Sequence, residues 1–312
     1  MSAVLLFILV LILLTLVAIV LHIQKETRIE NEIKIKGGIK GEIKKESEIK
    51  GGVWDSGNEI LTAYSIANNN EKKRLLSVLS KPFEYSKRLK QKSLIENLIR
   101  NKASDSEIYN YICNESGFSV QSGYKKDTYF QLLSQHVNLI KPKYLDVGGG
   151  DGKITEAIAK GLNTSEAHCI DIIQREDNSM VKYHKLENYE EEIKFPFQDN
   201  YFDIITSFMV LHHVKLLDEE LSEIYRVLKP GGIFYIREHN SENKFDQLLI
   251  DIEHMIYIIC NCELVKNPYI FNHRNMNEWV EKLEQHKFKP IIKPDYFGYT
   301  PHTKGFYLIL KK

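Results

Sequence analysis

The chain has 312 residues, with 42 basic and 42 acidic side chains, so its formal net charge is zero. Its 43% hydrophobic and 11% aromatic content excludes a disordered protein, and its four scattered cysteines exclude a disulfide scaffold. The length suits one or two domains, and the zero net charge argues against a uniformly basic nucleic-acid-binding protein.

The first element in the chain is an apolar run. Residues 3–21 are all apolar except Thr15, which is close to the ~20 residues that a helix needs to cross a bilayer. The run lacks the basic start and the small-residue cleavage site of a signal peptide, and a buried core helix is the alternative. We therefore expect a transmembrane anchor at residues 1–23.

Basic residues follow this run but do not precede it. Residues 24–52 contain eight Lys or Arg, so the positive-inside rule predicts a single-pass membrane protein with a cytosolic C-terminal part. The cysteines show no metal-ligand spacing, as is typical of a reducing compartment. Because the same residues repeat EIK and IKGG, we expect a charged low-complexity linker whose lysines could also contact anionic headgroups.

Residues 53–123 are expected to form short basic helices. Ser104 and Glu107 have the spacing of a capping box, and an apolar face is formed by Leu94, Ile95, Leu98 and Ile99. Residues 71–102 contain ten Lys or Arg against three Glu, a net charge of +7. We interpret these charges as a solvated face. Contact with an anionic membrane is the alternative, and RNA binding ranks third because aromatic residues do not interleave with the charges.

A predicted strand at residues 144–147, a glycine-rich turn and a predicted helix come next. This unit is typical of doubly wound α/β folds, in which the ligand lies beyond the carboxyl ends of the strands. Gly148, Gly150 and Gly152 follow the pattern GxGxG, and Lys153 stands where a dinucleotide fingerprint has its third glycine. This difference argues against an NAD-linked oxidoreductase.

Two acidic residues indicate which ligand the turn binds. Asp146 precedes the turn, where a negative charge suits a ligand with an ammonium group, such as the methionine part of S-adenosylmethionine (SAM). Asp171 lies nineteen residues past Gly152, in a second predicted strand, where it can accept hydrogen bonds from both ribose hydroxyls. NAD-binding proteins also have an acid at the position of Asp171, but its combination with DxGxGxG favours SAM.

Four segments resemble, in order and spacing, the motifs of class I SAM-dependent methyltransferases of the type 11 group: LDVGGGDGKIT, CID, FPFQDNYFDIITSFMVLHHV and EIYRVLKPGGIFYIREH. The resemblance covers about residues 124–312. It implies an α/β, Rossmann-like, seven-stranded and mostly parallel sheet with an antiparallel last strand, preceded here by the helical segment and the transmembrane helix. It also implies SAM as the cofactor, bound by Asp146, Gly148, Gly150, Gly152 and Asp171.

Further cofactor contacts are expected from later segments. Ser207 and Phe208 end the predicted strand at residues 203–208 and would reach the ligand crevice. Glu187 is the candidate for the acid that contacts adenine, although an insertion follows it. By resemblance, Tyr124 could close over SAM.

Four residues are candidates for catalysis. His239 directly follows the fifth predicted strand, and Asp251, His254 and Tyr257 share one face of a helix expected at residues 244–262. Together they could form an acid–base pocket around the substrate. A polar stripe satisfied by a neighbouring segment is the alternative.

Other histidines are assigned no chemistry. The LHHV context of His212 and His213 resembles the family's helix start after the fourth strand, so both are expected to be packing residues. A metal site of His239, Asp251 and His254 has no recognised ligand spacing, and none is assigned.

The sequence thus predicts a membrane-anchored SAM-dependent methyltransferase whose catalytic domain is cytosolic and whose acceptor is a small or lipid-like molecule. The alternative is a catalytically inactive binding or scaffold protein of the same fold at a membrane. The expected parts are an anchor, a linker, a basic helical region and a methyltransferase domain, at residues 1–23, 24–52, 53–123 and 124–312. Nucleic acid is not an expected partner, because no aromatic-plus-basic pattern is present.

Overall fold

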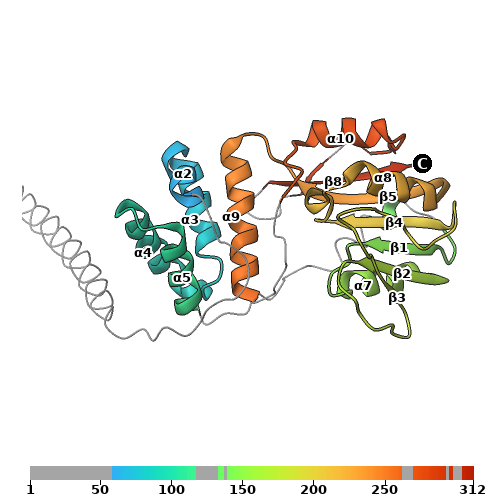
Figure 1. The fold of residues 1–312 in the computed structure, drawn as a ribbon, viewed down its shortest axis with the longest axis horizontal. Coiled ribbons are helices and arrows are strands. Elements are labelled where there is room, and N and C mark those ends of the chain that lie inside the picture. Colours follow the sequence, from blue (N-terminus) through green and yellow to red (C-terminus); the bar gives the residue numbers. More distant parts are fainter. Residues whose placement is uncertain (1–57, 117–132, 137–138, 262–269, 293–294, 298–303) are drawn as a thin grey trace, which may run out of the picture. The chain divides into compact units, whose positions relative to one another are not determined.

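Two sets of elements make up the described residues: a group of helices, and a mixed sheet with helices on both faces (Figure 1). The computed structural model describes residues 58–116, 133–136, 139–261, 270–292, 295–297 and 304–312, all within the unit Asp55–Lys312. The predicted anchor, the predicted linker and Tyr124 lie outside the described residues.

The expected localisation as a single-pass membrane protein is corrected. Among the described residues, no helix is both long enough and apolar enough to cross a membrane. The longest of these helices, α9 (Lys244–Asn261), has 18 residues and carries four charged side chains, Lys244, Asp246, Asp251 and Glu253. The expected transmembrane helix, the membrane partner and the cytosolic placement therefore have no support. The apolar run at residues 3–21, on which they were based, lies outside the described part of the chain.

The first group of helices begins at Glu59. It consists of α2 (Glu59–Ile66), α3 (Asn69–Leu79), the 3-10 turn η1 (Tyr85–Lys87), α4 (Arg88–Arg100) and α5 (Asp105–Ser116). The predicted capping box is confirmed, because Glu107 N donates to Ser104 Oγ (3.3 Å) and Ser104 N donates to Glu107 Oε2 (2.9 Å). A second capping box, between Asn68 and Glu71, starts α3.

Helix α9 completes the core of this group, although it lies far along the chain. Its buried side chains pack with those of α2–α5, and they are Phe245, Leu248, Leu249, Ile252 and Ile256. Two ion pairs of 2.8 Å join the same helices, from Arg74 to Asp246 and from Lys81 to Glu253. The expectation of a fully solvated basic face is therefore wrong for Arg74 and Lys81, whose charges face acids of α9.

The sheet has the strand order β3-β2-β1-β4-β5-β8-β6, and β7 also pairs with β8. Its strands are β1 (Lys143–Val147), β2 (Glu166–Asp171), β3 (Lys182–Lys185), β4 (Phe202–Phe208), β5 (Leu228–His239), β6 (Lys289–Pro290), β7 (Asp295–Phe297) and β8 (Gly305–Lys311). Strands β1 to β5 pair in parallel, whereas β8 is antiparallel to β5. The predicted Rossmann-like α/β sheet with an antiparallel last strand is thus confirmed. Seven strands form the continuous order, as predicted, and among the described residues β7 is an additional short segment that pairs with β8 as β6 does.

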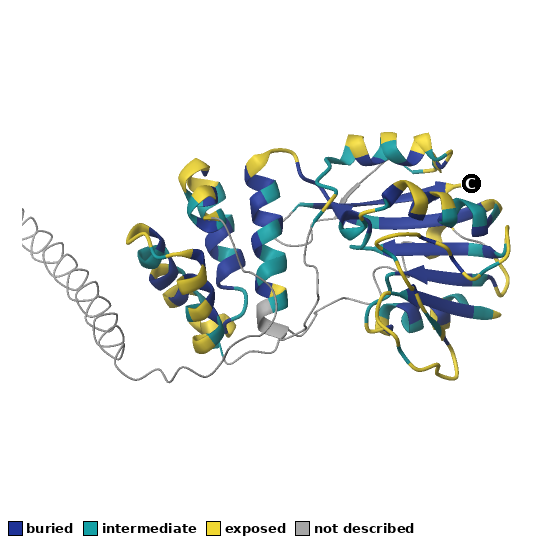
Figure 2. Cartoon of the chain, in the orientation of Figure 1, coloured by how far each residue is buried: buried dark blue, intermediate teal, exposed yellow. Residues whose placement is uncertain are grey.

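Alternating side chains of the strands supply two cores, one on each face of the sheet. In β8, Phe306 and Leu308 face a core with residues of α8 (Leu217–Val227) and α10 (Met276–Gln285), whereas Tyr307 and Ile309 face a core with α7 (Lys153–Leu162). This period-2 alternation is the pattern of a sheet covered on both faces. Figure 2 shows the strands buried and the outer side of α10 exposed.

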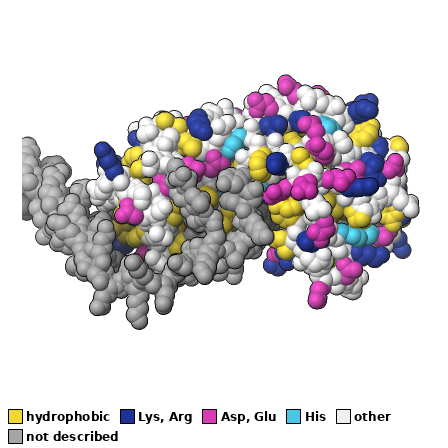
Figure 3. Space-filling model, in the orientation of Figure 1, with side chains coloured by type: hydrophobic (Ala, Val, Ile, Leu, Met, Phe, Trp, Pro, Cys, Tyr) yellow, Lys and Arg dark blue, Asp and Glu magenta, His cyan; other side chains and the backbone are white. Residues whose placement is uncertain are grey.

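Charges of both signs are interspersed on the face of the molecule in Figure 3. The segment of residues 185–223 carries ten acids against three Lys, a net charge of −7. Several of these acids pair with bases that follow the segment in the chain, including Glu223 with Arg226 of the same helix (2.6 Å) and Asp203 with Lys229 of β5 (2.7 Å). The acidic segment is therefore partly neutralised within the fold.

Glu220, in the first turn of α8, is a buried carboxyl group with 3% exposure. Burial first, and then the charge of Asp171, raises the pKa of Glu220 to about 8. The folded state therefore favours its protonated form.

We predict that replacing Leu249 by Ala lowers the free energy of unfolding by about 2–5 kcal/mol, because Leu249 is fully buried where α9 meets the other helices. Urea unfolding followed by circular dichroism measures the change. Leu89→Ala in α4 is the matched control, since Leu89 is 78% exposed and should change stability little. Equal losses for the two variants would contradict the packing described for α9.

We also predict that Glu220 makes stability fall as pH rises. Its stabilising contribution is complete below the unfolded pKa of 4.5 and is lost as pH rises through the folded pKa of about 8. One such group changes the free energy of unfolding by at most about 1.4 kcal/mol per pH unit. Glu220→Gln should therefore gain stability relative to the unmodified protein as pH increases over this range, whereas Glu219→Gln, at an exposed position, should not. A difference that does not vary with pH would rule this out.

Candidate active site

The glycine loop joins β1 to α7 at the carboxyl edge of the sheet. Gly148, Gly150 and Gly152 have φ values of 72°, 56° and 75°, in the left-handed region that favours glycine. A Cβ atom at Gly148 would lie 2.3 Å from Val210 Cγ2, and one at Gly152 would lie 2.0 Å from the hydroxyl of Tyr183. At Gly150 no atom of the described residues lies within 4 Å of the added Cβ, so the described part of the loop is open on this side.

Asp146, near the end of β1, connects the start of the glycine loop to α7 and β4. It is buried, and its carboxylate accepts hydrogen bonds of 2.6 Å from the hydroxyls of Thr155 in α7 and Thr206 in β4. Burial raises the pKa of Asp146 to about 6, against the opposing effect of the two hydroxyls. The side chain thus fixes the loop to its neighbouring elements, and its contact with an ammonium group stays a prediction.

Asp171, the last residue of β2, lies beside the loop as expected. Its Oδ2 accepts from Gly150 N (2.8 Å) and its Oδ1 accepts from Ile173 N (3.0 Å). Each oxygen keeps a second lone pair, which is what two ribose hydroxyls require. Burial raises the pKa of Asp171, while these backbone donors oppose the rise. Arg175 Nε donates to the carbonyl of Gly150 and joins the loop after β2 to the glycine loop.

The carboxyl end of β4 carries two further candidates. Ser207 is fully buried, and its hydroxyl has no hydrogen-bond partner among the described residues. Phe208 contacts Tyr235 edge-on, with ring centroids 4.9 Å apart. Met209 follows with a φ of 62°, which is uncommon for a residue other than glycine and typical of strained functional sites.

Glu187 lies just after β3. The backbone N–H of Leu186 donates to the carbonyl of Asp171 (2.8 Å), so Glu187 follows directly on a residue bonded to the tip of β2. Its own carboxylate is exposed and pairs with Lys185 at 2.9 Å. Contact with adenine would require this side chain to leave Lys185, and its role stays a prediction.

Three histidines from different elements meet at the same edge of the sheet, and we call them the histidine cluster: His212, His239 and His254. One ring nitrogen of each lies within 4.8 Å of those of the others. His212 belongs to the 3-10 turn η2 (Leu211–His213) after β4, His239 ends β5, and His254 lies in α9. The Nε2 atoms of His212 and His254 are 3.1 Å apart.

Glu238 supports this cluster from within the protein. Its Oε1 accepts from the backbone N–H groups of Val210 (3.1 Å) and Leu211 (2.8 Å), and its Oε2 lies 2.5 Å from His212 Nδ1. Burial raises the pKa of Glu238 to about 7. Burial also lowers the pKa of His212 and of His239 well below 6.5, so both rings are neutral near neutral pH.

The structure brings together only part of the predicted catalytic set. His239 and His254 are neighbours, with ring centroids 5.2 Å apart. Asp251 instead contacts His273, with 3.0 Å between Oδ1 and Nε2. Tyr257 is 44% exposed.

His212 was expected to be a packing residue, and it is buried; it is also a member of the cluster, 2.5 Å from Glu238. The available indication was the position of LHH after one predicted strand and EH after the next. Adjacent parallel strands end at the same edge, so these side chains could have been expected to meet.

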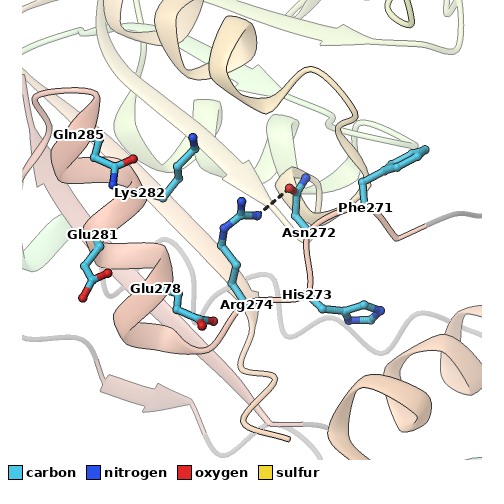
Figure 4. A pocket seen from close by; sticks show the side chains of 8 residues that line it. All are labelled: Phe271, Asn272, His273, Arg274, Glu278, Glu281, Lys282 and Gln285. Atoms are coloured by element: carbon cyan, nitrogen blue, oxygen red, sulfur yellow. Dashed lines mark hydrogen bonds between the residues drawn. The ribbon is translucent and has the colours of Figure 1, made fainter. Parts of the chain in front are cut away.

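A polar pocket of about 420 Å³ adjoins the cluster (Figure 4). It is lined by residues of α10 and of the segment before it, and these are Phe271, Asn272, His273, Arg274, Glu278, Glu281, Lys282 and Gln285. Asn272 joins this segment to η2, because its side chain donates to the carbonyls of Leu211 (3.0 Å) and Val214 (2.6 Å). In Figure 4 Arg274 donates to Asn272, whereas His273 projects to the side away from α10.

Comparisons with known proteins agree with this geometry. Residues 145–236 match the family model described as "Methyltransferase domain". The Sterol 24-C-methyltransferase of Candida albicans is 28% identical over 180 residues, which cover 52% of this chain and 46% of that protein. A Ubiquinone/menaquinone biosynthesis C-methyltransferase of Vibrio vulnificus is 33% identical over 117 residues, which cover 34% of this chain and 44% of that protein. The chain spans about half the length of these curated relatives.

Solved structures are also similar. A SAM-dependent methyltransferase from Aquifex aeolicus has a TM-score of 0.43 and 19% identity, covering 60% of this chain and 88% of that one. The matched family segment contains the glycine loop, Asp171 and Ser207. The match over residues 145–236 supports the expectation of a methyltransferase domain in this part of the chain.

Proposed function

We propose that this protein transfers a methyl group from SAM to a small-molecule acceptor. The observation that carries the proposal is the glycine loop. It is open at Gly150, and Asp171 lies directly beside it with free acceptor capacity on both oxygens. The match of this segment to the methyltransferase family supports the same conclusion.

The residues at the loop fit the cofactor. Asp171 would accept hydrogen bonds from the ribose hydroxyls, and the backbone around Gly150 would contact the methionine part. Ser207 supplies a buried hydroxyl without a partner among the described residues, which is costly unless a ligand satisfies it. Phe208 and Glu187 are the candidates for the adenine side. When bound, SAM supplies a methyl group on a positively charged sulfur.

Catalysis would depend on alignment of the acceptor and on removal of its proton. Methyl transfer is an in-line displacement, so holding the acceptor in place supplies much of the rate enhancement. His239 lies at the end of β5 and His254 lies within α9, and an imidazole nitrogen at either position would accept the proton. Asp251 would act through His273, which it contacts, and Tyr257 remains a candidate on the same helix.

For the acceptor, we propose a lipid-like small molecule that carries a polar group. The curated relatives are named for sterols and for ubiquinone biosynthesis, which supports an apolar skeleton. The pocket beside the histidine cluster contains Arg274, Glu278, Glu281 and Lys282, which favours a polar group at one end of the acceptor.

The cofactor assignment predicts that Asp171→Ala weakens SAM binding by at least about tenfold, because charge-assisted hydrogen bonds contribute about 1.5–3 kcal/mol each. Isothermal titration calorimetry of the full-length chain measures the affinity. Glu176→Gln is the matched control, since Glu176 is an exposed acid in the loop after β2 and should not affect binding. If the unmodified protein binds no SAM, or if both variants bind like it, the assignment is wrong.

The catalytic assignment predicts that His254→Gln lowers kcat by about 10²–10⁴-fold and leaves SAM affinity unchanged, as for loss of a general base. The assay incubates the protein with methyl-labelled SAM and either a lipid extract or an aqueous extract, and then follows the label. Label in the lipid fraction is expected. SAM binding without label transfer to any fraction would instead favour an inactive binding protein of this fold.

A further inference from the structure

We propose that the histidine cluster, His212, His239 and His254, binds a divalent transition-metal ion, and that this ion is zinc. The proposal goes beyond methyl transfer: with the ion bound, His239 and His254 act as its ligands and not as proton acceptors. It rests on the close spacing of the ring nitrogens, on burial, and on the chemistry of three imidazole ligands.

The hydrogen bonds of His254 fix its tautomer. Its Nδ1 lies 2.8 Å from the carbonyl oxygen of Ile250, which can only accept a hydrogen bond. Nδ1 therefore carries the hydrogen, and in the neutral ring Nε2 presents a lone pair.

Glu238 fixes the orientation of His212. Its Oε1 accepts from two backbone N–H groups, and its Oε2 lies 2.5 Å from His212 Nδ1. Nε2 of His212 is therefore the ring nitrogen that faces His254, and the two Nε2 atoms lie 3.1 Å apart.

The spacing of these two nitrogens fits a metal ion. Two nitrogen ligands of a tetrahedral zinc ion, each about 2.0–2.1 Å from the metal, lie roughly 3.3 Å apart. The observed separation of 3.1 Å between His212 Nε2 and His254 Nε2 is close to that value.

His239 supplies the third ligand. It is buried, its Nε2 has no hydrogen-bond partner among the described residues, and it belongs to the group whose ligand atoms lie within 4.8 Å of one another. Three imidazoles suit zinc, whereas magnesium and calcium prefer oxygen ligands. A three-ligand zinc site leaves a fourth position for water or for an acceptor atom.

Glu238 contacts His212 in the way that carboxylates commonly contact zinc-binding histidines, at the ring nitrogen that is not a ligand. Its Oε2 lies 2.5 Å from the ring nitrogen of His212 that does not face the cluster, and this contact orients the ring. Removal of such a carboxylate typically weakens metal binding about 10–100-fold.

The test uses the full-length protein, first treated with a chelator and then titrated with zinc, and in parallel with cobalt. We expect one zinc ion per chain by elemental analysis, an increase in thermal stability, and the visible absorption of four-coordinate cobalt. His254→Ala should abolish the cobalt absorption, and Glu238→Gln should weaken zinc binding about 10–100-fold. Because α9 helps to form the helical core, circular dichroism must show that each variant is folded.

Two controls separate this site from other arrangements. His184→Ala disrupts a second histidine pair, in which His168 Nδ1 and His184 Nε2 are 2.8 Å apart, and it should leave metal binding unchanged. Asp251→Asn should also leave it unchanged, because Asp251 contacts His273 and is not a ligand. The proposal is overturned if the folded protein binds neither ion, or if His254→Ala binds them as well as the unmodified chain. Metal binding is measured without SAM, so failure here is distinct from failure of the methyltransferase proposal.

Discussion

The hydrogen bonds of the Glu238 carboxyl group are the interactions on which the turn after β4 and the histidine cluster depend. Glu238 lies near the end of β5, next to β4, and it accepts hydrogen bonds from the backbone of Val210 and Leu211 and from the ring of His212. A buried carboxylate is stable only when donors surround it, so the turn after β4 must keep the conformation that supplies those donors. The same turn brings Val210 against Gly148, which leaves no room for a side chain in the glycine loop. The glycine loop and the turn after β4 are thus in direct contact.

The carboxyl edge of the sheet has two parts, one beside the glycine loop and one beside the histidine cluster. Strands β1 and β2 end in Asp146 and Asp171, which shape the glycine loop and offer oxygens to the proposed cofactor. Strands β4 and β5 end near Ser207 and His239, and they face the proposed acceptor. Met209, with its left-handed backbone, lies where the two parts meet. Backbone strain at such a point is tolerated because the neighbouring strands hold the turn on both sides.

Most of the sheet and the cofactor loop were predictable from the sequence, because they depend on short local patterns. Glycine spacing, apolar strands and the Ser104–Glu107 capping box are each encoded within a few residues. The pairing of His212 with His254 was not predictable, since it depends on the packing of α9 more than forty residues away. The pairing of Arg74 with Asp246 has the same cause. Charge patterns along a chain do not reveal partners that only a tertiary contact provides.

Helix α9 belongs to two environments at once. One side of it completes the hydrophobic core of α2–α5, and its His254 reaches the turn after β4. A shortened chain that begins at the sheet would therefore expose the apolar side of α9 to water and lose the force that orients this histidine. The basic helices are therefore part of the structure that positions His254. They set the position of His254 beside the turn after β4, so sequence changes in them can move this side chain without changing the residues around it.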